Sequence, residues 1–168
     1  HIMKSHRKPD DDYQELKDIG MTDISMEVVA DSVLATVKEA HRLHEKFGEV
    51  TTIKVPCTPD GLQSCHELAK EGIKVNVTLI FSQVQAILAA KAGAAYVSPF
   101  VGRVDDNSFG GLCLVKDIAK VFREHMVRTQ VLAASIRGAR DVGRAFEYGS
   151  DIVTMPVGVF EKCYKHIL

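Results

Sequence analysis

The chain has 168 residues, of which 46% are hydrophobic and 26% charged, and its formal net charge is −1. This apolar content and balanced charge are typical of a single globular domain over residues 1–168 and exclude a disordered chain. A nearly neutral chain is not expected to bind nucleic acid through bulk electrostatics. No apolar run approaches the roughly 18 residues that a membrane-spanning helix needs, so no membrane partner is expected.

The cysteines and histidines form no recognisable metal site. The four cysteines are scattered without CxxC or zinc-ligand spacing, and the seven histidines form no HxH or HxxxH arrangement. The cysteines are therefore predicted to be reduced thiols, which favours a cytoplasmic protein. Neither a metal nor another cofactor is expected.

Short β-branched runs alternate with longer amphipathic stretches along most of the chain. The opening segment, 4–18, resembles a solvated helix. Strands are predicted over residues 23–30, 50–56, 74–80, 96–101, 131–136 and 151–156. Helices are predicted to begin near Ser32, Pro59, Ser82, Gly111, Gly138 and Val157, and glycines that suit helix ends stand at Gly48, Gly72, Gly93 and Gly149. Strands and helices that alternate with short connections predict an α/β fold with a parallel sheet.

A (β/α)8 barrel fits these cycles better than the other parallel folds. The GxGxxG and GxxxxGK[ST] motifs of dinucleotide and nucleotide phosphate sites are both absent. A barrel uses about 30 residues per strand–helix unit, so this chain holds about five to six units. The sequence therefore predicts a TIM barrel that lacks about the first two strands and the last part of the C-terminal helix.

Polar residues occupy one alternating set of positions in the predicted strands. Strands buried on both faces should be almost continuously apolar, and these depart from that rule on one face only. The polar set is Ser25, Glu27, Thr52, Lys54, Lys74, Asn76, Thr78, Ser98 and Ser135. Because alternate residues point to opposite faces, the set is expected to converge inside the barrel, where active sites lie at the carboxyl ends of the strands.

Lys54 is the candidate nucleophile of this polar set. A lysine on a strand usually lies at an exposed edge, with its charge in water. Lys54 instead stands between Ile53 and Val55 and just before Pro56, in a strand flanked by two predicted helices. Desolvation favours the uncharged, nucleophilic form of an amine, and Glu27 is expected beside it on the neighbouring strand. We therefore interpret the pair as functional.

Arg103 and Arg137 form a second candidate site, because each follows directly on a predicted strand. Arginine with nearby hydroxyls and loop amides suits the binding of a phosphate dianion, and loops after the late strands of barrels often do this. The alternative, in which each arginine is an ordinary solvated loop residue, stays open.

These residues lie in four segments that resemble transaldolase. The segments are KVP at 54–56, GIKVNVTLIFS at 72–82, VSPFVGR at 97–103 and VLAASIR at 131–137. Their order and spacing are specific, and the resemblance runs from about residue 24 to the end. It points to the short-chain transaldolases, a group of class I Schiff-base aldolases that also contains the fructose 6-phosphate aldolases.

The resemblance implies that Lys54 forms an imine with a ketose phosphate, while Glu27 and Thr78 hold the catalytic water. The family also uses an aspartate on its first strand as general acid and base, and an asparagine in a TTNP-like turn on its second. Neither segment has a counterpart in this sequence.

The resemblance also implies a set of substrate-binding residues. Asn76 would hydrogen-bond substrate hydroxyls, and Ser98 would lie close to the imine. The phosphate would be bound by Arg103, Ser135 and Arg137. These sugar phosphates, together with further copies of the chain in a ring or double ring, are the partners that the family suggests.

The expected activity is that of a transaldolase, a transferase of ketone groups. It would move a dihydroxyacetone unit from sedoheptulose 7-phosphate to glyceraldehyde 3-phosphate in the pentose phosphate pathway. The related aldolases carry tyrosine where this chain has Phe100 and glutamine where it has Glu27, so a fructose 6-phosphate aldolase is the second hypothesis. A non-catalytic paralogue that binds phosphate or serves as an oligomer subunit is the third.

Overall fold

The computed structural model describes residues 8–166. Six strands form one sheet in the order β1-β2-β3-β4-β5-β6, and each neighbouring pair is parallel. The strands are β1 (Ile24–Glu27), β2 (Thr51–Pro56), β3 (Lys74–Ile80), β4 (Tyr96–Pro99), β5 (Gln130–Ala133) and β6 (Ile152–Val153). The helices are α1 (Pro9–Asp18), α2 (Val33–Phe47), α3 (Pro59–Lys70), α4 (Gln83–Lys91), α5 (Val101–Asp105), α6 (Gly111–Glu124), α7 (Ala139–Glu147) and α8 (Val157–Lys162), with a 3₁₀ turn, η2 (Gly48–Val50), after α2.

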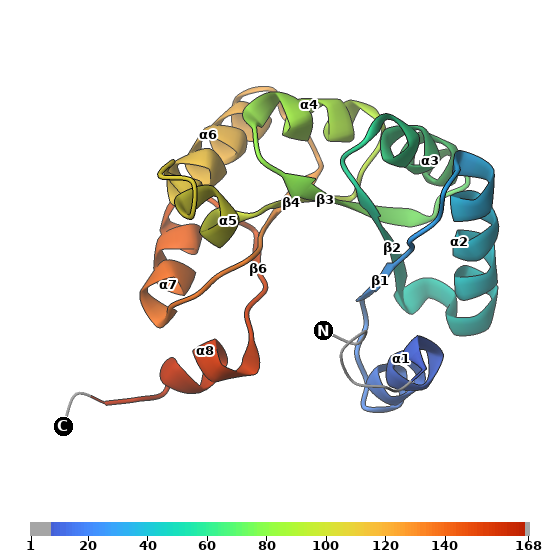
Figure 1. The fold of residues 1–168 in the computed structure, drawn as a ribbon, viewed down its shortest axis with the longest axis horizontal. Helices are drawn as coiled ribbons and strands as arrows, with labels where there is room; N and C mark the ends of the chain where they lie inside the picture. Colours follow the sequence, from blue (N-terminus) through green and yellow to red (C-terminus); the bar gives the residue numbers. More distant parts are fainter. Residues whose placement is uncertain (1–7, 167–168) are drawn as a thin grey trace.

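The sheet is curled into an arch, and helices cover its convex side (Figure 1). α2, α3, α4, α6 and α7 lie along the outside, while α1 and α8 lie at the two ends of the arch. The predicted α/β architecture with a parallel, barrel-like sheet is confirmed. Residues 8–166 supply six strands of it, which make a half-barrel. None of the helices in this range has the length and apolarity that crossing a membrane requires.

The hydrophobic core lies between the convex face of the sheet and the helices. Ile53 and Val55 of β2 and Val75 and Val77 of β3 are fully buried in it. These apolar residues alternate with the polar set, which the strand geometry turns to the concave face. The predicted alternation therefore separates the face of the sheet that packs against the helices from the face that carries the polar side chains.

The alternation fails at one predicted position, Leu79. The sequence pattern predicts Leu79 on the packed face with Val75 and Val77, but Leu79 has a φ of 59° and is half-exposed. The pairing of β3 with β4 shifts register between Val77 and Ile80, and Ile80 takes the buried position instead. This irregularity at the carboxyl end of β3 interrupts the two-residue period.

Helix α5 is the element that the sequence pattern did not predict. The predicted strand 96–101 ends at Pro99, because Val101 begins this helix. The backbone N–H groups of Val101 and Gly102 donate to the carbonyl oxygens of Ala134 and Ser135, at 2.9 and 3.1 Å. These bonds attach α5 to the segment that follows β5.

The other strand boundaries differ from the prediction mainly by length. β3 matches residues 74–80 in full, and β2 begins one residue later than predicted. β1 and β6 are shorter than predicted, with four and two residues inside the predicted runs. β5 also has four residues, and it begins one residue before its predicted run and ends three residues before the end of that run. The ends of these runs are loop segments that carry the chain from the sheet to the helices.

Side-chain caps begin three helices where the sequence predicts them. Ser32, Thr58 and Ser82 accept hydrogen bonds from backbone N–H groups in the first turns of α2, α3 and α4. Ser82 and Gln85 form a reciprocal capping box. The glycines predicted at helix ends all have positive φ: Gly48, Gly72, Gly93 and Gly149.

α1 confirms the helix predicted in the opening segment, from Pro9 onward, while residues 4–7 lie outside the described range. The helix is not wholly solvated. Tyr13 is buried, and its ring meets the ring of Phe47 edge-on at 5.8 Å between centroids. This contact attaches α1 to the carboxyl end of α2.

Gly61 lies in the first turn of α3, where the helix passes close to the end of β2. A Cβ at this position would stand 2.0 Å from the carbonyl oxygen of Pro56. Replacing Gly61 with alanine is therefore expected to lower the free energy of unfolding by about 1–3 kcal/mol, measured by urea denaturation. Gly143→Ala is the control, because nothing lies within 4 Å of a Cβ there. Since alanine favours helix over glycine, Gly143→Ala should leave stability unchanged or raise it.

Candidate active site

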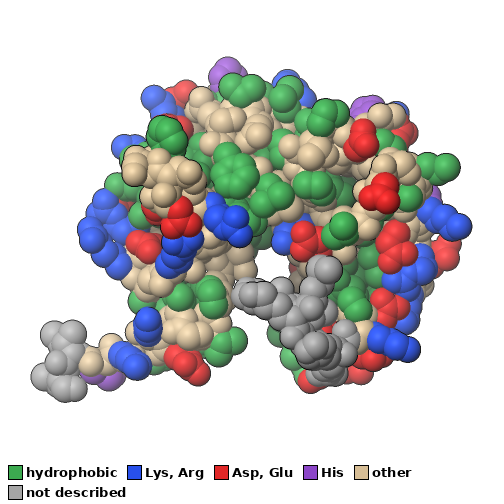
Figure 2. Space-filling model, in the orientation of Figure 1, with side chains coloured by type: hydrophobic (Ala, Val, Ile, Leu, Met, Phe, Trp, Pro, Cys, Tyr) green, Lys and Arg blue, Asp and Glu red, His purple; other side chains and the backbone are tan. Residues whose placement is uncertain are grey.

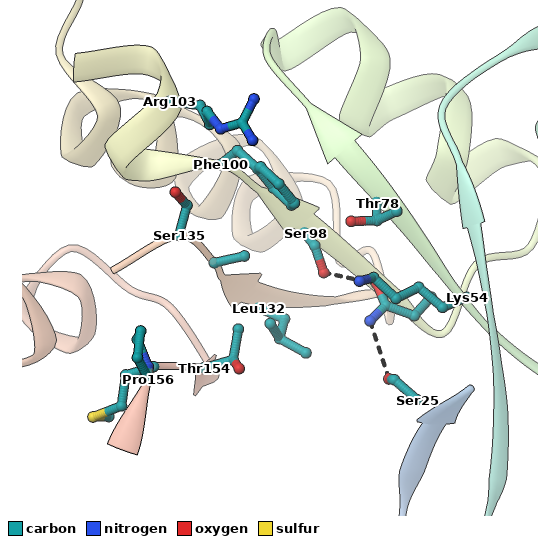
Figure 3. A pocket seen from close by; sticks show the side chains of 13 residues that line it. Ser25, Lys54, Thr78, Ser98, Phe100, Arg103, Leu132, Ser135, Thr154 and Pro156 are labelled. Carbon is teal, nitrogen blue, oxygen red and sulfur yellow. Dashed lines mark hydrogen bonds between the residues drawn. The ribbon is translucent and has the colours of Figure 1, made fainter. Parts of the chain in front are cut away.

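The concave face of the sheet lines a cavity of about 420 Å³ near the carboxyl ends of the strands (Figure 3). It is lined by Ser25, Lys54, Asn76, Thr78, Ser98, Phe100, Arg103, Leu132, Ala134, Ser135, Thr154, Met155 and Pro156. Most of the predicted site residues are in this set. Glu27 and Arg137 are not in the set. The carboxylate of Glu27 contacts Lys54, and the guanidinium of Arg137 is bound to Asp106.

The strand register explains why the central residues meet. In the pairing of β1 with β2, Glu27 lies opposite Lys54, and in the pairing of β2 with β3, Lys54 lies opposite Asn76. Pro56 at the end of β2 pairs with Thr78. Parallel strands in this register place inward side chains of equal height side by side. The amine, the carboxylate, the amide and the hydroxyl therefore come from three consecutive strands.

Lys54 has one ionic partner among the described residues. Its Nζ lies 3.6 Å from Oε2 of Glu27, and the Lys54 side chain is 26% exposed. The distance is that of an ion pair and too long for a good hydrogen bond. The amine thus lines the cavity beside a carboxylate, and none of the residues in the range 8–166 forms a hydrogen bond with it.

Asn76 lies opposite Lys54 in the pairing of β2 with β3, and its side-chain amide is held on both sides. Its Nδ2 donates to Oγ of Ser25 at 3.2 Å, and its Oδ1 accepts from Oγ of Ser98 at 2.7 Å (Figure 3). Asn76 and Ser98 are both buried. Fixed hydrogen bonds of this kind hold polar groups in one orientation toward a ligand.

Thr78 places a buried hydroxyl on the cavity wall. It is buried, and its Oγ1 has no hydrogen-bond partner among the described residues. Buried polar groups are usually hydrogen-bonded, so an orphaned hydroxyl on a cavity wall suits a site that binds water or a polar substrate atom. The resemblance to transaldolases implies that Thr78 holds a water molecule, and this role stays a prediction.

A second polar cluster, centred on Asp23, lies toward the amino ends of the same strands. Asp23 accepts hydrogen bonds from Thr52 at 2.7 Å, from Lys74 at 2.7 Å and from the hydroxyl of Tyr96 at 2.8 Å. Burial alone would raise the pKa of Asp23, but these hydrogen bonds outweigh it and leave the pKa below its ordinary value. Burial and the Asp23 charge raise the pKa of Tyr96 to about 12, so its hydroxyl stays a donor.

Sequence reasoning places Thr52 and Lys74 in the inward set but misses Asp23 and Tyr96. The alternation of inward and outward residues could have found both. Asp23 stands two residues before Ser25, and Tyr96 stands two residues before Ser98, so each is the preceding inward position of its strand.

The two predicted phosphate-binding arginines are in different surroundings. Arg103 lines the cavity together with Ser135, whose φ is 59°. Arg137 does not line the cavity, because both of its terminal nitrogens hydrogen-bond the carboxylate of Asp106. That guanidinium holds the pKa of Asp106 below its ordinary value.

The four cysteines differ in exposure: Cys65 is buried, whereas Cys113 and Cys163 are exposed. All four are free, and burial raises the pKa of the Cys65 thiol to about 12. Burial also raises the pKa of Cys57. Within the described range, no three His, Cys, Asp or Glu side chains gather where they could hold a metal ion.

In the view of Figure 2, charged side chains gather along the outer edge of the arch, and the arch encloses a hollow. Lys54 lines the cavity on the concave face, so its amine is reached from the inside of the arch. The site combines a reachable primary amine, a carboxylate, orienting hydroxyls and an arginine at one end. Such a set suits covalent chemistry on a carbonyl compound that carries an anionic group.

Residues 11–168 match the family model described as "Transaldolase/Fructose-6-phosphate aldolase". Curated relatives named "Probable transaldolase" are similar over most of the chain. The protein from Nitrosopumilus maritimus (strain SCM1) is 45% identical over 168 residues, which cover 99% of this chain and 75% of the relative. The protein from Kosmotoga olearia is 53% identical over 145 residues, or 86% of this chain and 66% of the relative.

A third relative of the same printed name, from Anaeromyxobacter sp. (strain K), is 46% identical over 167 residues, which cover 99% of this chain and 76% of the relative. The matches thus cover 66–76% of the length of these three proteins. Because the family model covers nearly the whole chain, the match includes every strand of the arch. The chain belongs to the transaldolase/fructose-6-phosphate aldolase family.

Proposed function

We propose that the chain carries the Schiff-base site of a transaldolase, which moves a dihydroxyacetone unit from sedoheptulose 7-phosphate to glyceraldehyde 3-phosphate. The observation that carries the proposal is the position of Lys54. Its amine lines the polar cavity beside the carboxylate of Glu27, at 3.6 Å. Membership of the family supports the same reading. These substrates would place the reaction in the pentose phosphate pathway.

Lys54 acts as the nucleophile in this mechanism. Its uncharged amine attacks the ketone carbonyl, and water leaves after proton transfer to give a protonated imine. The imine then accepts the electron pair of the adjacent carbon–carbon bond, so that an aldose phosphate departs and an enamine stays on Lys54. The enamine attacks the carbonyl carbon of the acceptor aldose, and water hydrolyses the resulting imine.

Glu27 and Thr78 move protons to and from the water of these steps. Glu27 is within ionic reach of Lys54, and the Thr78 hydroxyl is buried with no partner among the described residues. The proton of the hydroxyl that becomes the leaving aldehyde needs a further base. The aspartate that the resemblance assigns to this task has no counterpart in the chain.

The neighbouring side chains orient the substrate. Asn76, fixed by Ser25 and Ser98, hydrogen-bonds the hydroxyls of the three-carbon unit. Arg103 and Ser135 bind the phosphate at the other end of the cavity. A sugar phosphate that is held at both ends keeps its carbonyl carbon at the amine.

Borohydride reduction tests the covalent step. Incubating the protein with sedoheptulose 7-phosphate and borohydride is expected to fix a stable adduct on Lys54, located by peptide mass spectrometry. Lys74 is an internal control, because its amine points to the same concave face but is held by Asp23 at 2.7 Å. An adduct on Lys74, or none on a folded protein that still binds phosphate, would reject the mechanism. The second result would favour a non-catalytic paralogue.

A fructose 6-phosphate aldolase is the second candidate, because the matching family contains both activities. The position of Phe100 favours the transferase. Its ring lines the cavity and lies 6.0 Å from the ring of Phe81 between centroids. Phenylalanine has no hydroxyl that could pass a proton to released dihydroxyacetone. Release of free dihydroxyacetone from fructose 6-phosphate without an acceptor aldose would identify the aldolase instead.

A further inference from the structure

Arg137 lies against the helix that carries Arg103. A Cβ on Gly102 would stand 2.6 Å from Nε and 3.1 Å from Cδ of Arg137, so the arginine stem passes directly over this glycine. The same glycine donates its backbone N–H to the carbonyl oxygen of Ser135 at 3.1 Å. Arg103, the next residue in the chain, and Ser135 both line the cavity (Figure 3). The stem of Arg137 is therefore next to the cavity, although its guanidinium is engaged elsewhere.

The group that engages Arg137 is the carboxylate of Asp106, which follows α5 directly. Both terminal nitrogens of Arg137 donate to it, one to each carboxylate oxygen. A phosphate dianion uses the same two-pronged geometry toward arginine. Asp106 and a phosphate thus compete for one set of donors.

The ion pair between Arg137 and Asp106 is weak enough for a phosphate to replace the carboxylate. The side chains of Arg137 and Asp106 are 54% and 45% exposed, and exposed ion pairs contribute little to stability. Asp105, the neighbouring carboxylate, is not an equivalent competitor. It accepts the backbone N–H of Gly111 at 2.8 Å and is occupied at the start of α6.

We propose that Asp106 is the internal counter-ion of the anion-binding end of the site. Asp106 binds the guanidinium of Arg137 when the site is empty. The phosphate group of a sugar phosphate displaces Asp106 and then binds both Arg137 and Arg103. Asp106 therefore sets the affinity of the site for phosphorylated substrates. The identity of the ligand as a sugar phosphate rests on the proposed function.

Inorganic phosphate is the probe, and its dissociation constant is measured by isothermal titration calorimetry on the purified protein. Asp106→Asn keeps the size of the side chain but removes the competing charge, so phosphate should bind about two- to fivefold more tightly. Asp106→Ser, a second variant, should shift affinity in the same direction. Asp141→Asn is the matched control. It removes one carboxylate from the first turn of α7, close to Gly138, and should change affinity less.

A double-mutant cycle separates a specific counter-ion from a general effect of charge. Arg137→Gln should weaken phosphate binding, and adding Asp106→Asn to it should then have no further effect. The proposal is overturned if Asp106→Asn acts equally in both backgrounds, if Asp141→Asn matches it, or if Asp106→Asn weakens binding. Weaker binding would mean that Asp106 positions Arg137 for phosphate rather than competing for it.

The borohydride adduct on Lys54, measured on the same variants, keeps the two proposals apart. An adduct without the predicted shift in phosphate affinity would reject the counter-ion and keep the Schiff base. The predicted shift without an adduct would do the reverse.

Discussion

Replacing Lys54 with methionine is expected to reduce transaldolase turnover by about 10³-fold or more, because the reaction then has no amine to form the imine. Methionine preserves the unbranched apolar stem between the buried neighbours of β2, so the fold should remain. Activity is read from the transfer of the three-carbon unit to glyceraldehyde 3-phosphate. Far-ultraviolet circular dichroism and the urea midpoint report on folding.

Lys74→Met is the matched control, since it removes an amine from the same concave face on the next strand. Lys74 is bonded to Asp23 and has no part in the proposed covalent step. This variant is expected to lose some stability but to keep turnover and the Lys54 adduct. Equal losses from the two substitutions would show that a charged concave face, and not one nucleophile, supports the activity.

Val77→Asp is expected to unfold the protein. Val77 is fully buried at the centre of the sheet, and an unpaired carboxylate there loses both apolar contacts and hydration. The loss is several kcal/mol, about the whole margin of a small domain. Loss of the cooperative urea transition and of soluble protein is the expected readout.

Leu79→Asp is the control on the same strand. Leu79 is half-exposed, and its φ of 59° lies in a region that aspartate tolerates better than leucine. This variant should keep the native transition, with a change within about 0.5 kcal/mol. If Leu79→Asp unfolds the protein as Val77→Asp does, the assignment of faces near the end of β3 is wrong.

The two-residue period predicted most of the site, because it follows from strand geometry alone. In β2 and β3, Lys54 and Asn76 each stand between two buried apolar residues, so the pattern separates the two faces before any contact is known. Lys54, Asn76 and Thr78 line the cavity for this reason.

The pattern stops at the point where the strands end. Leu132, Ala134 and Ser135 all line the cavity, although Ser135 was expected on the face opposite Ala134. The φ of Ser135 is 59°, which takes this residue out of the alternation. Beyond a strand, the direction of a side chain depends on turn geometry and on contacts such as those from α5, and no period encodes them.

The partner of Arg137 could not be predicted for a related reason. Asp106 is 31 residues away and directly follows a short helix, α5, that the hydrophobic pattern did not reveal. An ion pair between two loops depends on how both loops are placed on the sheet. The sequence could show that two arginines follow strands, but not that one of them is already occupied.

Sequential pairing of the strands has a consequence for how the molecule acquires its structure. Because every strand lies beside its neighbour in the chain, each strand–helix–strand unit can close through its own crossover helix before the next unit exists. Folding of this kind has a low contact order for a parallel sheet and needs no distant segment as a template. Growth of the arch can therefore follow the direction of synthesis, one repeat at a time.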